Sequence, residues 1–140
     1  MTILDTNVLS EIMAVSPSQT ALKWVRNRRL ADKVVITAIT VAEILYGVEL
    51  LAQGKRREKL GADAEAMFVQ DFARDILPFD DRAARSFSRI AASRRNQGRP
   101  IAEMDAQIAA IAQLHGATLA TRNTADFEGC DIRLANPWLD

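Results

Sequence analysis

The sequence predicts an α/β fold in which a mainly parallel sheet of about five strands is covered by helices on both faces. Strand-sized runs rich in β-branched residues recur along the chain, and helical patterns fill the gaps between them. These runs are almost entirely apolar rather than alternating, which is typical of strands that are buried on both faces. The expected strands are Thr2–Leu4, Val34–Thr37, Ile76–Phe79, Ala117–Thr121 and Ile132–Leu134.

A helical hairpin interrupts this alternation between Val41 and Arg74. Its first arm is an apolar helix that we expect to begin at Thr40, to end at Gly54 and to be buried almost all round. Its second arm carries the apolar stripe Leu60, Ala64, Met67, Phe68 and Phe72. No strand-like run separates the two arms, so the hairpin is an insertion in the α/β pattern.

The remaining helices have recognisable ends. Ser18 is a suitable N-cap for a helix with Ala21, Leu22 and Val25 on one face. Asp80 or Asp81 caps another helix, whose stripe is Ala84, Phe87, Ile90 and Ala91. A last long helix follows Pro100 and is ended by Gly116.

Length and composition predict a single domain over residues 1–140, with 49% hydrophobic residues. One cysteine, Cys130, excludes an internal disulfide and suits a reducing compartment. The N-terminal segment lacks the basic and apolar regions of a signal peptide. The longest apolar stretch, Ile39–Ala52, contains Glu43 and Glu49 and is too short to span a membrane. We therefore expect a cytoplasmic protein without a membrane partner.

Net charge does not indicate a nucleic-acid partner, because 18 basic and 18 acidic residues cancel. The basic residues nevertheless gather in three clusters: Arg26, Arg28 and Arg29; Lys55, Arg56 and Arg57; and Arg94, Arg95 and Arg99. Such clusters are usually solvated helix faces and ends, and we interpret them so.

Four acidic residues carry the functional signal: Asp5, Glu43, Asp105 and Asp126. Each lies where a strand or loop passes into a helix. In an open parallel sheet these positions gather along one edge, where ligands bind. Four carboxylates at one edge repel one another unless a cation neutralises them, so they predict a divalent-metal site.

Three of these acids also have simple structural explanations. Asp5 could be the N-cap of the helix that follows it, a contact worth about 1 kcal/mol. Glu43 could close a capping box with Thr40, although it lies roughly 120° around the helix from the polar stripe of Glu49 and Gln53. Asp126 could favour the start of a short helix capped by Asn123 or Thr124.

Asp105 resists such an explanation. It shares a helical face with Ile101, Ile108 and Ala112, so it points toward the core. No lysine or arginine lies three or four residues away, and an ionised side chain on an apolar face needs a partner. Oxygen ligands of this kind suit Mg²⁺ or Mn²⁺. Zinc is not expected, because His115 and Cys130 are the only softer ligands.

Four motifs in order, and a closing Asn136-Pro137-Trp138, resemble those of PIN-domain ribonucleases, particularly VapC-type toxins of the FitB-like branch. The motifs are Leu4-Asp5-Thr6-Asn7, Thr40-Val41-Ala42-Glu43, Met104-Asp105-Ala106-Gln107-Ile108-Ala109-Ala110 and Ala120-Thr121-Arg122-Asn123-Thr124-Ala125-Asp126-Phe127. The likeness covers essentially the whole chain. It implies a three-layer α/β/α sandwich and Mg²⁺- or Mn²⁺-dependent endoribonuclease activity. It also implies a homodimer, a cognate antitoxin, and a larger toxin–antitoxin complex that reaches DNA through the antitoxin.

The resemblance assigns roles to particular positions. Asp5, Glu43 and Asp105 match the three core acids, while either Asn123 or Asp126 completes the set. We expect Asp5, Asp105 and Asp126 to ligate the metal, with Glu43 as ligand or water-orienting base. Thr6, Asn7, Thr121 and Asn123 are expected to support these acids. Arg122 is the best candidate for a substrate phosphate contact, and the Lys55–Arg57 cluster could touch RNA or antitoxin.

Other functions fit less well. A phosphatase with an aspartyl nucleophile needs a second acid two residues after Asp5, where this chain has Asn7. A nucleotide-binding domain needs a glycine-rich first turn, which is missing. The remaining alternative is a non-catalytic PIN-like module that binds RNA or protein.

Overall fold

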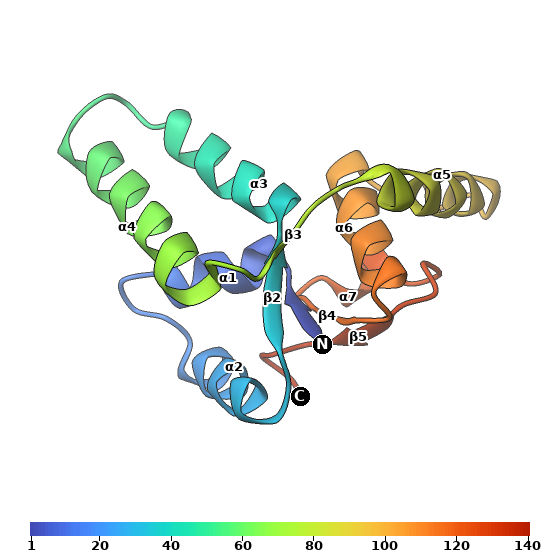
Figure 1. The fold of residues 1–140 in the computed structure, drawn as a ribbon, viewed down its shortest axis with the longest axis horizontal. Coiled ribbons are helices and arrows are strands. Elements are labelled where there is room, and N and C mark those ends of the chain that lie inside the picture. The colour runs from blue at the N-terminus through green and yellow to red at the C-terminus, as the bar shows by residue number, and fades with distance from the viewer.

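The computed structural model describes residues 1–140 and contains a five-stranded parallel sheet of order β3-β2-β1-β4-β5 (Figure 1). The strands are β1 Thr2–Leu4, β2 Val34–Thr37, β3 Ile76–Leu77, β4 Thr118–Ala120 and β5 Arg133–Ala135. All five predicted strands are therefore present. The run predicted over Ile76–Phe79 pairs only at its first two residues, and Pro78 directly after it has no N–H to continue the ladder.

The helices are α1 Thr6–Met13, α2 Gln19–Ala31, α3 Ala38–Glu49, α4 Lys55–Phe72, α5 Asp81–Asn96, α6 Glu103–Leu114 and α7 Thr124–Phe127. Two predicted caps are confirmed: the Ser18 hydroxyl accepts from the amide of Ala21, and the Asp80 carboxylate accepts from that of Ala83. No helix combines the length and the apolar character needed to cross a membrane.

Two apolar cores lie on opposite faces of the sheet, which gives the expected α/β/α layers. Ile3 and Val35 pack with α5 and α6 on one face. Leu4 and Ile36 point the other way and pack with α1, α2 and α4. Figure 1 shows α5 and α6 to one side of the sheet, with α2 and the α3–α4 hairpin to the other. Alternation along each short strand supplies both cores.

The α3–α4 hairpin is confirmed, but its first helix differs from the prediction. The N-cap is Thr37, whose hydroxyl accepts from the Thr40 amide at 3.1 Å, so α3 begins at Ala38. The capping box of Thr40 with Glu43 is therefore wrong, since Thr40 already lies within the helix. Gly54 does not end α3; it precedes α4 with φ +150°, a conformation that favours glycine.

The expectation that α3 is buried almost all round is also wrong. Its hydrophobic residues extend onto a face that the rest of the chain leaves open, where Tyr46 is 63% exposed. Leu50, directly after the helix, is 67% exposed. Composition alone could not distinguish an apolar helix in the core from one with an apolar exposed face.

The buried stripe of α5 is offset from the predicted one. Ala84 is exposed, whereas Ala83, Ser86, Ile90 and Arg94 are the buried positions of this helix. Arg94, which we had interpreted as part of a solvated cluster, is 4% exposed. The offset follows from the observed periodicity, since Ile90 and Arg94 are separated by one helical turn.

Candidate metal centre

The four predicted acids line one pocket of about 250 Å³ at the carboxyl edge of the sheet. Asp5 directly follows β1, Glu43 lies in α3 after β2, and Asp126 lies in α7 after β4. Asp105 reaches the same pocket from the first turn of α6. The remaining lining residues are Thr6, Asn7, Asn123 and Phe127. Acids separated by up to 121 positions in sequence, Asp5 and Asp126, are thus brought together by the parallel sheet.

Asp5 is both a helix cap and a pocket residue. It is 5% exposed, and its Oδ1 accepts from the amide of Thr6 at 2.8 Å, as expected for the N-cap of α1. Its Oδ2 accepts from the hydroxyl of Thr121 at 2.7 Å. The two explanations weighed for Asp5 are therefore compatible, because capping uses one oxygen and leaves the second beside the pocket.

Asn7 and Thr121 join the loop after β1 to the loop after β4. The Asn7 amide nitrogen lies 3.3 Å from both Asp5 Oδ2 and Thr121 Oγ1. Its oxygen accepts from the backbone N–H of Arg122 at 3.1 Å, and Thr121 Oγ1 accepts from that of Asn123 at 3.1 Å. These contacts fix the two loops relative to each other. The supporting role that the resemblance implies for these residues stays a prediction.

Glu43 faces Thr6 rather than the start of its own helix. The hydroxyl of Thr6 donates to Glu43 Oε1 at 2.7 Å and lies 3.0 Å from the hydroxyl of Thr40. Thr40 is fully buried. The sequence suggested Thr40 only as a cap, so this contact to the site was missed.

The pocket gathers four acidic side chains and no basic residue to compensate their charge. Burial raises the pKa of Asp105 to about 6, and repulsion from Asp5, Glu43 and Asp126 adds to the effect. Burial also raises the pKa of Asp5, against the hydrogen bonds from Thr121 and Thr6 that lower it. None of the four acids forms an ion pair with a lysine, arginine or the N-terminus.

The pocket suits a hard cation that keeps part of its water shell. No three acidic, histidine or cysteine side chains are close enough together to enclose an ion by themselves. Mg²⁺ is commonly held by one or two carboxylates together with waters and substrate phosphates, so an open set of carboxylates fits it. Neither softer ligand lines the pocket, since Cys130 is buried elsewhere and His115 caps the far end of α6.

The predicted basic contacts lie outside the pocket. Arg122 is exposed, and its guanidinium lies 4.9 Å from the centre of the Trp138 ring rather than among the pocket-lining residues. In the Lys55–Arg57 cluster, Arg57 pairs with Glu49 across the hairpin turn. Glu103, the extra acid near Asp105, is exposed.

Sequence reasoning also missed Arg94, whose guanidinium donates to the backbone carbonyl of Asp126 at 2.7 Å. The periodicity of α5 contained the signal, because Arg94 lies one turn after the buried Ile90. Its membership of an arginine-rich cluster concealed it.

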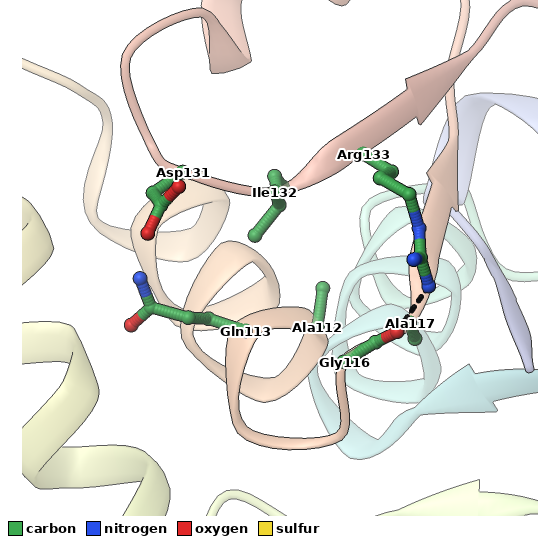
Figure 2. Close-up of a pocket in the computed structure, with 7 residues that line it drawn as sticks. All are labelled: Ala112, Gln113, Gly116, Ala117, Asp131, Ile132 and Arg133. Carbon is green, nitrogen blue, oxygen red and sulfur yellow. Dashed lines mark hydrogen bonds between the residues drawn. The ribbon is translucent and has the colours of Figure 1, made fainter.

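A second pocket, of about 150 Å³, lies at the opposite edge of the sheet (Figure 2). Its residues come from the end of α6, the start of β4 and the start of β5: Ala112, Gln113, Gly116, Ala117, Asp131, Ile132 and Arg133. Arg133 donates to the carbonyl of Gly116 at 2.5 Å. With Asp131 as its single acid, this pocket lacks the cluster of carboxylates found at the carboxyl edge.

Comparison with known proteins agrees with this geometry. Residues 2–130 match the family described as PIN domain. The chain is 40% identical to Toxin FitB of Neisseria gonorrhoeae over 140 residues, the whole of both proteins. It is 36% identical to VapC ribonuclease Y4jK of Sinorhizobium fredii, over 99% of this chain and 98% of that protein. A chain in the structure of FitAB bound to an IR36 DNA fragment matches with a TM-score of 0.89 and 40% identity, over 99% of this chain and 96% of that chain. This chain therefore belongs to the PIN-domain family, in the branch of the FitB toxin and the VapC ribonucleases.

Proposed function

We propose that this protein is a Mg²⁺- or Mn²⁺-dependent endoribonuclease and the toxin of a toxin–antitoxin pair. The observation that carries the proposal is the convergence of Asp5, Glu43, Asp105 and Asp126 on one pocket with no basic partner. Membership of a branch that includes VapC ribonuclease Y4jK supports the same activity.

The residues of the pocket would have different roles in catalysis. Asp5, Asp105 and Asp126 would hold the cation together with water molecules, and Glu43 would ligate it or orient the attacking water as a base. When bound, the cation neutralises charge on the scissile phosphate and makes a water molecule more acidic. Thr6 donates a hydrogen bond to Glu43, and Thr121 donates one to Asp5, which partly offsets the rise in the pKa of Asp5 that burial causes.

Cleavage of a total tRNA pool by antitoxin-free protein tests the activity, with Mg²⁺, with Mn²⁺ and with EDTA. We expect metal-dependent cleavage that is lost in Asp105→Asn. Glu103→Gln is the matched control, because Glu103 lies in the same first turn of α6 but is exposed and outside the pocket. Equal cleavage by wild type and Asp105→Asn would exclude the proposed site. RNA binding without cleavage under any metal would favour the non-catalytic alternative.

The proposal extends to the partners. The FitAB structure, which is bound to DNA, supports a cognate antitoxin and a larger complex that the antitoxin places on DNA. We also propose a homodimer. Light scattering of the purified toxin should then give the mass of two chains, whereas the mass of one chain at micromolar concentration would contradict the dimer.

A further inference from the structure

Arg94 is a buried cation without an acidic partner. It is 4% exposed in the last turn of α5, and no carboxylate lies within ion-pair distance of it. Its guanidinium contacts only uncharged groups: Nε donates to the carbonyl of Arg99 at 2.8 Å, and Nη1 donates to that of Asp126 at 2.7 Å and lies 3.4 Å from Cys130 Sγ. Burial of an unpaired charge is costly, so these contacts need an explanation.

The contact to Asp126 gives the explanation. α7 has only four residues, and the carbonyls at the end of a helix have no partner within it. Arg94 binds the carbonyl of Asp126, and Arg99 Nη2 donates to that of Ala125 at 3.3 Å. The side chain of Asn123, the residue that precedes α7, makes no capping hydrogen bond. Arg94 and Arg99 therefore supply side-chain donors for the carbonyls near the end of α7, whereas no side chain caps its start.

A second observation shows how closely these segments fit. Gly129, two residues after α7, has φ +83°. A Cβ at this position would lie 2.9 Å from Oε1 of Gln97 and 3.6 Å from Cδ of Arg94. The chain after Asp126 thus packs against the end of α5. A larger residue at position 129 would be strained mainly by the positive φ, because the exposed Gln97 side chain can move aside.

We propose that Arg94 is a positioning residue, which holds the backbone of Asp126 so that its carboxylate faces the cation pocket. The inference rests on the proposed metal-binding role of Asp126. Asp126 itself is exposed. The buried Phe127 beside it and the contact of Arg99 with Ala125 also hold α7, and Arg94 is the side chain that binds the backbone of Asp126 itself. Arg94 acts through the backbone and does not touch the reacting groups.

Mn²⁺ binding measured by calorimetry tests the proposal. We expect Arg94→Met to weaken Mn²⁺ binding roughly 10- to 100-fold, as is typical when the partner of a metal ligand is lost. Arg95→Met is the matched control, because it removes the same charge from the next residue, which is exposed. It should change the affinity less than twofold. Hydrogen exchange in the metal-free protein should become faster over residues 124–127 in Arg94→Met and not in Arg95→Met.

A double variant separates positioning from a general loss of structure. If Arg94 acts through Asp126, Arg94→Met should weaken Mn²⁺ binding little further in an Asp126→Asn background. An equal weakening in both backgrounds, or unchanged binding by folded Arg94→Met, would overturn the proposal. If Arg94→Met does not fold, Arg94→Lys keeps the charge but has a single donor nitrogen, and the same criteria apply to its smaller effect. Absence of Mn²⁺ binding by the wild type would refute the proposed function, while the exchange data would still decide whether Arg94 anchors α7.

Discussion

Aspartates near the two ends of β1 have pKa values that move in opposite directions. Asp32, beside the amino end, accepts hydrogen bonds from the N-terminal amino group at 2.8 Å and from the Thr2 hydroxyl at 2.8 Å, and these contacts lower its pKa to about 2. Asp5, at the carboxyl end, is buried near other acids without a cation, and its pKa is raised. The difference distinguishes a charge that is compensated within the fold from charges that call for an external cation.

The largest expected effect is a difference in Mn²⁺ affinity between two variants that each lose the carboxylate at one end of β1. Asn caps a helix about as well as Asp, so Asp5→Asn should fold with α1 intact. We expect its Mn²⁺ affinity to fall by more than the roughly 10- to 100-fold that loss of an outer partner costs. Asp32→Asn should bind Mn²⁺ as the wild type does. Calorimetry measures the Mn²⁺ affinity of both variants, and circular dichroism verifies that they fold. Equal losses of Mn²⁺ affinity in Asp5→Asn and Asp32→Asn would contradict this prediction.

An effect of intermediate size is expected for Asp105→Asn, on the free energy of unfolding of the metal-free protein. The folded pKa of Asp105 is about 6 against an ordinary value of 3.8, so the folded state retains a proton that the unfolded state releases between these values. Stability from this group therefore falls as pH rises through that window. Asp105→Asn should raise the free energy of unfolding at pH 7.5 by on the order of 1 kcal/mol after allowance for solvent screening.

Urea denaturation of metal-free wild type and Asp105→Asn at pH 4 and pH 7.5 measures this difference. The gain should shrink toward pH 4, where the wild-type carboxyl is protonated in the fold. Added Mn²⁺ should stabilise the wild type and not the variant. A variant that is less stable at pH 7.5 would mean that Asp105 is already compensated within the protein.

The smallest effect is expected for Asp32, near the amino end of β1, and it is again an effect on the free energy of unfolding. The folded pKa of Asp32 is lowered to about 2 from 3.8, so its stabilisation is present above pH 3.8 and is lost as the pH falls toward 2. The pair with the N-terminus is partly exposed, so Asp32→Asn should cost less than about 1 kcal/mol at pH 7. Urea denaturation at pH 7 measures this cost. A gain of stability at pH 7 would show that the pair is not favourable.

The fold was largely predictable because its signals are local. The five strands differ from helices in length and residue type, and Ser18 and Asp80 cap their helices through contacts of three residues or fewer. The errors concern tertiary context. The predicted cap of α3 is Thr40, whereas the actual cap is Thr37, because β2 ends there. The exposure of Tyr46 depended on which face the other helices cover.

The four acids of the candidate site could be named from the sequence, and the resemblance named supporting residues, but the contacts that hold the acids in place could not be predicted. A carboxylate on an apolar face, such as Asp105, is improbable enough to be noticed in a sequence. The contact of Thr6 with Glu43 joins residues 37 positions apart, and that of Arg94 with Asp126 joins residues 32 apart. Nothing in the local sequence around either residue indicates its partner.

By itself the sequence determined the α/β class, the strands and the four acids, because periodicity and residue type act over a few neighbouring positions. The tertiary structure decided which faces are open, that Arg94 is buried behind Asp126, and that Arg122 lies over Trp138 instead of in the pocket. Long polar side chains have many rotamers and reach partners in several directions, so their contacts depend on the packing of distant segments. For the same reason, the pKa of Asp105 follows from the assembled pocket and not from its own helix.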